Sequence, residues 1–575
     1  MINIHDETFE KNIDLLWDGY WYAELPPILD IDSIRDNLSH VIELIEEDAL
    51  KDFHLLENGA IESFKNVTPP SYIYNDGIEP ITFFEFKNNG ALREMQIPNL
   101  KYYIAFVYNT LSVYDELFSV LYNNEEMKEY VRHSNSYLLF NELFYVYRDY
   151  DGVIEEIESG IFAVKNNKIT GQLSYNENNI RFLESQGSKL YTVKIDIESF
   201  FPNVYTHYLG EIKNKEPFKS IPNIDYYFDF LDYYNMKTNN NQTKGIAAGV
   251  FSSTLSAELL MLCVDYEINQ VIGDDIEYLR YVDDMTFFCD SLEEISSKLP
   301  LIQRVLNKYR LRINNNKTET KLSVDNKAYV DMQMLKDKFT YLNLDEEPSI
   351  LDKNVFYNIK GYISRARESE RRSEIKAFLT MLKTAISSKH LTFDSEEPVR
   401  YEKYMSNLMI QLAQVEPTYA SRCYKIIEAI LNKIEDDEIR KSILGELKNK
   451  NPWINKNYHD SLVQIWHYYL LAKYDESYGF ETLENDFEDD EINPIIIASF
   501  ISEGEGSNKS VFNYIIQQYL QMDTKEAEPN AWKQTILFSK WWLPLCLICN
   551  KDGKNYKLYF DSNSFNEVYK TIFTC

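Results

Sequence analysis

The sequence predicts two successive parts, an α+β domain and then an all-helical domain. Segments in which apolar and polar residues alternate, as they do in β-strands, fall at 190–197, 278–282 and 285–289. Long segments with helical periodicity lie around them, at 101–122, 250–270 and 292–310. After about residue 350 the strand pattern nearly disappears, and apolar helical segments follow one another to about residue 545.

The length of 575 residues supports the same division, because a single core stops growing near ~250 to 300 residues. We expect the α+β domain at 1–345 and the helical domain at 346–575. Consecutive helical pairs of irregular length predict a bundle or a degenerate helical solenoid. Asp552-Gly553 lies between the apolar runs 545–549 and 556–560. This pattern predicts a small β-hairpin at the C-terminus.

The charge balance limits the kind of nucleic-acid contact that the protein can make. Lys and Arg number 59 and Asp and Glu number 91, so the formal net charge is −32. Such a molecule repels nucleic acid at long range, and any contact needs a local basic groove. Six cysteines give no disulfide framework, the N-terminus is polar, and no apolar run is long enough to span a bilayer. We therefore expect a cytoplasmic protein without a membrane partner.

The run Tyr281-Val282-Asp283-Asp284 lies between two strand-like segments. A turn at this point would expose a pair of carboxylates at the edge of a sheet. Carboxylates in this arrangement can hold the two Mg²⁺ ions that in-line nucleotidyl transfer uses. The alternative is a surface hairpin with an acidic turn, so a third carboxylate is needed to support a catalytic site.

Asp196 supplies that third carboxylate. It ends the segment 190–197, whose alternation puts Tyr191 and Val193 on one face and Asp196 on the other. Between Asp196 and Asp283 lies the glycine-containing stretch 243–261, which predicts a helix after a close backbone approach. Gly273-Asp274-Asp275 is interpreted as the loop between this helix and the next strand.

These three segments, in this order, resemble motifs A, B and C of the reverse transcriptases. Motif A matches as Asp196 with Phe200-Phe201, motif B as Gly-Ile-Ala-Ala-Gly-x-x-x-Ser from Gly245, and motif C as Tyr-Val-Asp-Asp. The resemblance implies a palm-and-fingers polymerase fold. It also implies that Asp196, Asp283 and Asp284 are catalytic and bind two Mg²⁺ or, alternatively, Mn²⁺ ions together with the carbonyl of Ile197.

The same resemblance assigns nucleotide-binding residues. Phe201 takes the place of the aromatic gate against a ribose 2′-hydroxyl, which implies dNTP substrates. Lys317 resembles the motif D lysine that protonates the leaving pyrophosphate, and Arg93 resembles the basic fingers residue that holds the triphosphate. Gly249 permits close approach of the backbone to the nucleotide. Exposed structural residues are the alternatives for Arg93 and Lys317.

Two departures indicate a branch of the family. Ala247-Ala248 replaces the Pro-Gln of most template-copying members, and a long helical region follows residue 345. The profile resembles the abortive-infection reverse transcriptases of bacterial antiphage defence, particularly the AbiK-like branch. That resemblance implies a HEAT-like helical domain, a homo-oligomer, and template-independent DNA synthesis primed by a protein tyrosine, with a single-stranded product attached covalently. Tyr20 and Tyr22 are guesses for the primer.

Two rival interpretations stay open at this point. The protein could be a template-copying reverse transcriptase that needs a non-coding RNA partner. It could also be a non-enzymatic helical scaffold with a vestigial palm.

Overall fold

The computed structural model describes most of the chain from residue 69 onward and isolated parts before it. The described residues are 16–17, 19–29, 34, 41–42, 45, 61, 64, 67, 69–113, 116–117, the elements between 146 and 181, and 182–551. Within the last range, residues 222, 274, 326–331, 394–398, 489, 505–507 and 524–531 are not described.

The first described elements form a two-stranded antiparallel sheet and a buried helix. They are β1 (Ile81–Phe86), β2 (Leu92–Ile97) and α4 (Leu100–Ser112). Asn99 caps α4, because its side chain accepts a hydrogen bond from the Lys101 amide at 3.1 Å. The remaining elements before the central sheet are β3 (Val146–Arg148), β4 (Ile154–Ile157), β5 (Phe162–Lys165), β6 (Lys168–Leu173) and α7 (Tyr175–Ser188).

A four-stranded antiparallel sheet in the order β10-β7-β9-β8 is the centre of the α+β part. Its strands are β7 (Tyr191–Asp196), β8 (Glu277–Tyr281), β9 (Asp284–Cys289) and β10 (Glu319–Leu322). The helices around it are α8 (Phe200–Asn203), α9 (His207–Glu211), α10 (Asp225–Lys237), α11 (Phe251–Ile272), α12 (Leu292–Lys308) and α13 (Met332–Lys338). The strands and helices predicted between 190 and 310 are confirmed within a few residues, and α11 ends at Ile272 before β8 begins at Glu277.

The described residues after 345 are almost entirely helical, as predicted. Its helices are α14 (Lys353–Glu368), α15 (Arg372–Ser387), α16 (Tyr401–Val415), α17 (Ala420–Leu431), α18 (Asp437–Lys448), α19 (Asn451–Asn457), α20 (Leu462–Tyr474), α21 (Phe480–Phe487), α22 (Pro494–Ser502), α23 (Asn508–Met522), α24 (Trp532–Thr535) and α25 (Trp542–Lys551). The short strands β11 (Ser349–Ile350) and β12 (Leu391–Thr392) pair in parallel among them.

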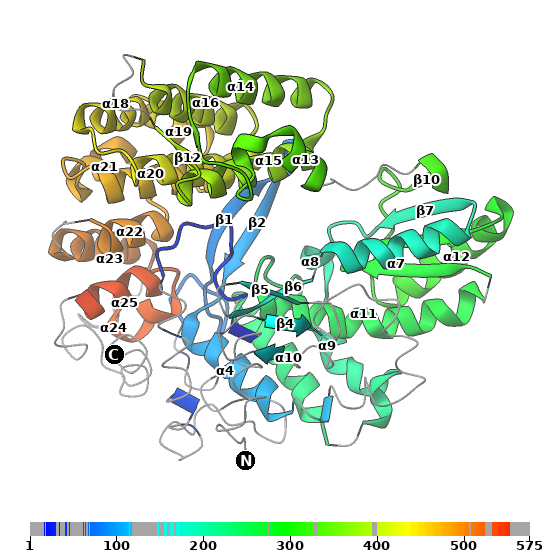
Figure 1. Cartoon of the computed structure of the whole chain (residues 1–575). Coiled ribbons are helices and arrows are strands. Elements are labelled where there is room, and N and C mark those ends of the chain that lie inside the picture. Colours follow the sequence, from blue (N-terminus) through cyan, green and yellow to red (C-terminus); the bar gives the residue numbers. More distant parts are fainter. Residues whose placement is uncertain are drawn as a thin grey trace.

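These helices stack in chain order. Helix α15 packs on α17, α17 on α20, α20 on α22, and α22 on α25, so they form one continuous row. Figure 1 shows them following one another down the left side of the molecule, with β1 and β2 running between them and the central sheet. Such stacking buries a continuous core between neighbouring helices, as in a helical solenoid. The HEAT-like assignment and the domain boundary at 345 stay predictions.

The predicted C-terminal hairpin is wrong in its first half. Residues 542–551 form the helix α25, and the second predicted strand lies outside the described residues. A short apolar run fits a buried helix as well as a strand. Trp542, Leu545 and Cys546 are all buried, so tertiary packing decides in favour of a helix that is covered by its neighbours.

The helical part packs directly on the first two strands. The Phe84 amide donates to the Asp460 carbonyl at 2.8 Å, and Asn493 Nδ2 donates to the Thr82 carbonyl at 3.0 Å. Trp466 Nε1 also donates to the Glu24 carbonyl at 2.7 Å. The β1–β2 sheet is therefore held by helices that follow it in the sequence by several hundred residues.

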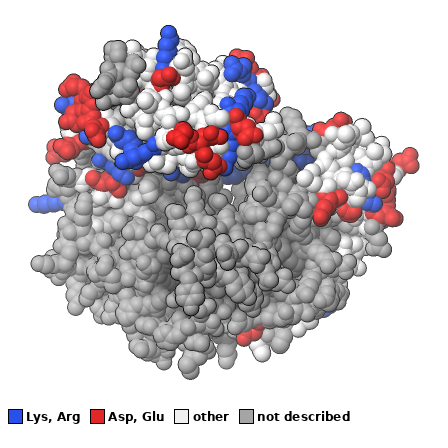
Figure 2. Space-filling model, in the orientation of Figure 1, with Lys and Arg blue, Asp and Glu red and all other residues white. Residues whose placement is uncertain are grey.

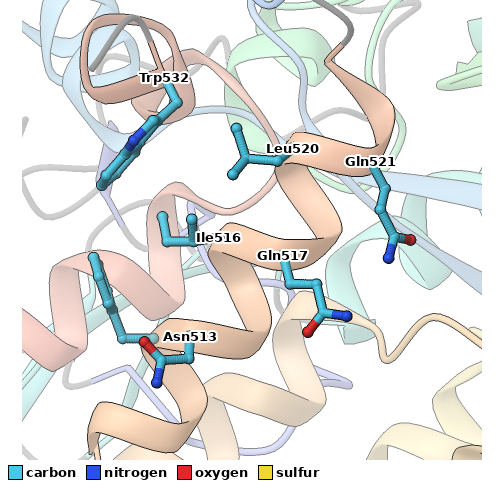
Figure 3. Close-up of a pocket in the computed structure, with 7 residues that line it drawn as sticks. Asn513, Ile516, Gln517, Leu520, Gln521 and Trp532 are labelled. Atoms are coloured by element: carbon cyan, nitrogen blue, oxygen red, sulfur yellow. The ribbon is translucent and has the colours of Figure 1, made fainter. Parts of the chain in front are cut away.

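At the far end of the row, an apolar hollow of about 480 Å³ lies between α23 and α24. In Figure 3 the side chains of Ile516 and Leu520 lie on the side that faces Trp532, whereas Gln517 and Gln521 point away from it. No helix in the described part of the chain is long and apolar enough to cross a membrane.

Candidate active site

The central sheet brings the three predicted carboxylates to one edge. Asp196 ends β7 and is paired in register with Asp284, which begins β9. Asp283 lies in the two-residue turn between β8 and β9, and its carbonyl accepts a hydrogen bond from the Ile197 amide at 3.3 Å. Val282 has a φ of 57°, which lets this tight turn close. The alignment of two antiparallel strand ends therefore gathers residues that are 87 positions apart in the sequence.

The loop 314–317 completes this edge. The Asn314 amide donates to the Asp196 carbonyl at 2.8 Å, and Asn314 Nδ2 donates to Asp196 Oδ1 at 3.0 Å. Lys317 Nζ lies 2.7 Å from Asp196 Oδ2. Lys317, which was predicted from its resemblance to motif D alone, is thus in direct contact with a candidate catalytic carboxylate.

Electrostatic repulsion between the carboxylates changes their acidity. Burial, followed by repulsion from Asp284 and Asp196, raises the pKa of Asp283 to about 6. Burial and Asp196 also raise the pKa of Asp284, against the attraction of Lys317 and Lys194. Such a cluster of like charges favours any cation that would neutralise it.

Arg93 contributes to the same field from β2. Its guanidinium lowers the pKa of Asp283 in part, which opposes the larger effect of burial and carboxylate repulsion. Arg93 is also within 3.9 Å of Glu85 on the neighbouring strand, and its side chain is half exposed. The structure therefore brings the predicted fingers arginine to the side of the catalytic edge.

The donor set fits a divalent metal ion in its chemistry. Asp196, Asp283 and Asp284 offer carboxylate oxygens, which Mg²⁺ and Mn²⁺ prefer. The Ile197 carbonyl was predicted as an additional ligand. It accepts none of the hydrogen bonds between described residues. Within the described part of the chain, however, no group of three acidic, His or Cys side chains is already drawn together as a metal cage. In this arrangement the ammonium of Lys317 forms an ion pair with one of the three carboxylates, that of Asp196.

Residues 142–345 match the family described as reverse transcriptase (RNA-dependent DNA polymerase). This segment is similar to the domains of that family. The family is one of nucleotidyltransferases of the DNA polymerase class, and the matched residues include the three aspartates, the glycine-containing segment and Lys317. Enzymes of this family use divalent metal ions, in agreement with the donor set.

Comparison with solved structures finds telomerases at low similarity. Apo telomerase from Candida tropicalis is 12% identical and has a TM-score of 0.31, covering 79% of this chain and 77% of that chain. A form of it truncated from the C-terminal domain is 15% identical with a TM-score of 0.29, over 51% of this chain and 55% of that chain. The chain thus spans about half the length of the truncated telomerase. No curated protein matches the sequence.

The motif B segment runs between the catalytic edge and the β1–β2 sheet. The Ala248 carbonyl accepts a hydrogen bond from the Gln96 amide of β2 at 3.2 Å. Gly249 has a φ of 95°, and a Cβ at this position would lie 2.4 Å from Met95 Cε and 3.5 Å from a ring carbon of Tyr22. The backbone conformation therefore favours glycine at 249, and a larger residue would also displace the flexible end of the Met95 side chain.

Phe201 is half-buried and lies against the start of the same segment. Its carbonyl accepts a hydrogen bond from the Ile246 amide at 3.1 Å, and its ring contacts Phe200 edge to face at 5.4 Å. The proposed gate residue is thus fixed to both motif A and motif B.

The two candidate tyrosines have different surroundings. Tyr20 is fully buried, and its hydroxyl donates to the Pro98 carbonyl at 3.0 Å. Tyr22 is half-buried beside Gly249, and Glu85 is close enough for its charge to act on the Tyr22 hydroxyl. Burial, and then the charges of Glu85 and Glu24, raise the pKa of Tyr22.

Sequence reasoning missed a buried ion cluster directly beneath the catalytic turn. Arg280 of β8 is fully buried, and its Nη2 atom lies 2.7 Å from both Glu258 and Asp265 of α11. Its Nη1 atom donates to the Val282 carbonyl at 3.0 Å, and the Tyr278 hydroxyl donates to Asp265 at 2.7 Å. Burial alone would lower the pKa of Arg280, but Asp265 and Glu258 raise it above its usual value.

This cluster ties the motif B helix to the turn of motif C. Because Arg280 bonds the carbonyl of Val282, the residue with positive φ, it holds the conformation that presents Asp283. The sequence did contain a signal for this cluster. Glu258, Asp265 and Arg280 are charged residues within the apolar segments that form α11 and β8. Charges in otherwise buried elements are nearly always paired.

Proposed function

We propose that the protein is a bacterial antiphage DNA polymerase of the abortive-infection type. It adds dNTPs to a single strand without copying a template, and one of its own tyrosines starts the strand. It acts in the cytoplasm as a homo-oligomer of a polymerase part (1–345) and a HEAT-like helical part (346–575). The resemblance of the sequence to AbiK-like reverse transcriptases is the origin of these finer assignments.

The observation that carries the template-independent assignment is the chemistry at position 248. Ala248 uses its carbonyl to bind β2, and its methyl side chain offers no hydrogen bond to a template base or an incoming nucleotide. Discrimination between bases depends on such polar contacts. The net charge of −32 also suits an enzyme that binds a single strand more than one that grips a long duplex.

Both kinds of charge are scattered over the helical part. Figure 2 shows patches of Lys and Arg interspersed with patches of Asp and Glu on the described helices at the top of the molecule. A duplex-binding surface would favour a continuous basic band.

The proposed chemistry uses the catalytic edge described above. Asp196, Asp283, Asp284 and the Ile197 carbonyl would hold two Mg²⁺ ions, which would activate the attacking hydroxyl and stabilise the leaving pyrophosphate. Lys317 would hold a proton within reach of the leaving group. Arg93 would bind the triphosphate, Phe201 would exclude a ribose 2′-hydroxyl, and Gly249 would let the nucleotide approach the backbone.

Tyr22 is the better supported of the two candidate primers. It lies beside Gly249, and the nearby carboxylate of Glu85 could accept the phenolic proton. The hydroxyl of Tyr20 is instead buried and already bonded to the main chain. A Tyr22→Phe variant should lose covalent nucleotide addition if Tyr22 is the primer, whereas Tyr20→Phe is the matched control.

The experiment that tests this function combines synthesis with mass measurement. Purified protein is incubated with dNTPs and Mg²⁺, with no added nucleic acid, and its intact mass is recorded. A ladder of nucleotide-sized additions is expected for the wild type and for Asp290→Asn, an exposed control at the end of β9. The ladder should be absent from Asp283→Asn.

A template-copying function is the second candidate, and the printed family description, RNA-dependent DNA polymerase, favours it. Protein that stays inert until RNA is supplied would establish this alternative. A scaffold with a vestigial palm would instead keep phage protection after replacement of Asp283 and Asp284 by Ala.

A further inference from the structure

A polar pocket of about 440 Å³ lies beside the catalytic edge, and none of the roles above uses it. Three segments form it: the residues that follow β7, the residues before Gly245, and the residues that follow α12. Its lining consists of Glu198, Asn203, Tyr205, Lys244, Arg310 and Arg312.

The main chain fixes this pocket to the catalytic strand. The Glu198 amide donates to the Arg312 carbonyl at 2.9 Å, which continues the pairing of Ile197 with Ile313. The loop that contains Arg312 also bonds the end of β7, because the Asn314 amide donates to the Asp196 carbonyl, two residues before Glu198. Because an extended chain spans at most about 3.6 Å per residue, the Cα atoms of Glu198 and Asp196 are within about 7 Å. The pocket is therefore adjacent to the reacting edge.

The segment that contains Lys244 is also held in the pocket by main-chain hydrogen bonds. Tyr205 and Lys244 form an isolated antiparallel bridge, and the Thr206 amide donates to the Thr243 carbonyl at 2.9 Å. The strand-like segment that carries Lys244 leads directly into Gly245. The pocket thus joins motif A, motif B and the loop of Lys317.

The pocket gathers positive charge in a strongly acidic protein. Lys244, Arg310 and Arg312 give three positive charges against one negative charge from Glu198, a local balance of +2. Among the acidic residues that the structure describes, none forms an ion pair with these three cations. Lys308, a neighbouring lysine at the end of α12, is by contrast paired with Glu267.

Arg310 is held in place without losing its hydrogen-bond donors. Its guanidinium lies over the Tyr205 ring at 5.0 Å from the ring centroid, and its backbone has a φ of 58°. The Tyr205 ring is in turn packed edge to face against His207 at 5.0 Å. Stacking on an aromatic face orients the planar fork of arginine, and such a fork binds phosphate oxygens in pairs.

We propose that this pocket is a phosphate-binding site beside the catalytic edge. Arg310, Arg312 and Lys244 bind phosphate oxygens, and Asn203 and Glu198 offer hydrogen-bonding groups for the sugar or base of the same nucleotide. The phosphate belongs either to a nucleic-acid strand that enters or leaves the site or to a free nucleoside triphosphate. The site adds a charged contact where the overall charge of the protein repels both ligands.

The test measures binding in EDTA without dNTPs, so it does not depend on DNA synthesis or on the proposed function. The probes are a fluorescein-labelled single-stranded oligo(dT), followed by anisotropy, and inorganic tripolyphosphate, followed by calorimetry. The variant is Arg310→Gln/Arg312→Gln. We expect on the order of tenfold weaker oligo(dT) binding, and a salt slope reduced by about 1.4 from the loss of two contacts to a single strand.

Arg304→Gln/Lys308→Gln is the matched control, since it removes two positive charges from the neighbouring helix α12 but outside the pocket. Arg310→Lys/Arg312→Lys should recover most of the affinity, and melting curves verify folding. Loss of oligo(dT) binding supports a strand phosphate as the ligand, and loss of tripolyphosphate binding alone supports a free triphosphate. The proposal is overturned if the pocket variant loses no more affinity for either probe than the control.

Discussion

Two ion pairs of equal length lie near the β8–β9 turn and have very different surroundings. At the catalytic edge, Lys317 and Asp196 are 2.7 Å apart, and the lysine side chain is 61% exposed. Beneath the turn, Arg280 and Asp265 are also 2.7 Å apart, and both side chains are fully buried. Distance alone therefore says little about what either pair contributes.

The difference is in how completely each charge is compensated. Around Arg280, every strong donor has a partner, and two carboxylates share one guanidinium. At the edge, three carboxylates repel one another, and water screens the one lysine in contact with Asp196. We infer that the buried cluster fixes the conformation of the turn, whereas the edge keeps excess negative charge for a cationic ligand.

The largest expected effect is the loss of the buried arginine. Arg280→Met leaves Glu258 and Asp265 buried without a counter-charge, which typically costs about 3–5 kcal/mol. We expect a fall in melting temperature of at least roughly 5 °C. DNA synthesis should also fall, because the Val282 carbonyl loses the bond that holds the turn.

The exposed Arg304→Met is the control for this prediction, and it should change stability by less than about 0.5 kcal/mol. Joint replacement by Arg280→Met, Glu258→Met and Asp265→Leu should recover much of the lost stability, because the unpaired charges are then removed. An Arg280→Met variant that melts like the wild type would contradict the assigned role of the cluster.

A smaller effect is expected from relieving repulsion at the edge. The pKa of Asp283 is about 6 in the folded protein, above its ordinary value of 3.8. Between these two values the folded state holds more protons than the unfolded chain, so this contribution to stability is present at low pH and is lost as pH rises through 6. Asp283→Asn should therefore stabilise the metal-free protein at pH 7.

The measurement is the difference in stability between Asp283→Asn and the wild type in EDTA across pH 4 to 8. The difference should be near zero at pH 4 and reach roughly 1–2 kcal/mol above pH 7, after allowance for partial solvent exposure. Asp290→Asn should show no such rise. A pH-independent difference would mean that the three carboxylates do not repel one another in solution.

The meeting of the three carboxylates at one sheet edge could be predicted from the sequence, because short-range patterns determine it. Alternation placed Asp196 at a strand end, and the tight turn between two apolar strands exposed Asp283 and Asp284. These features depend on a few neighbouring residues each. That these residues meet in space was expected from the resemblance in motif order. In the structure the pairing of β7 with β9 brings them together.

The buried cluster and the phosphate pocket could not be predicted in the same way. Arg280 is 22 residues from Glu258, and only the packing of β8 on α11 shows that they are partners. The pocket combines residues from three segments whose spacing has no regular period. Similarly, the first half of the predicted hairpin became α25 because burial by neighbouring helices outweighed local pattern.

The smallest expected effect on stability separates the two ion pairs most clearly. Lys317→Gln removes a 2.7 Å ion pair, yet we expect it to change stability by less than about 1 kcal/mol, because exposed pairs are screened by water and cost side-chain entropy. It should nevertheless slow nucleotide addition by about tenfold to a hundredfold if Lys317 protonates the leaving group. Lys321→Gln, on the adjacent strand β10, is the control and should affect neither property. A Lys317→Gln variant with normal turnover would show that this lysine only neutralises Asp196 in the absence of metal, and the functional difference between the two ion pairs would then reduce to burial alone.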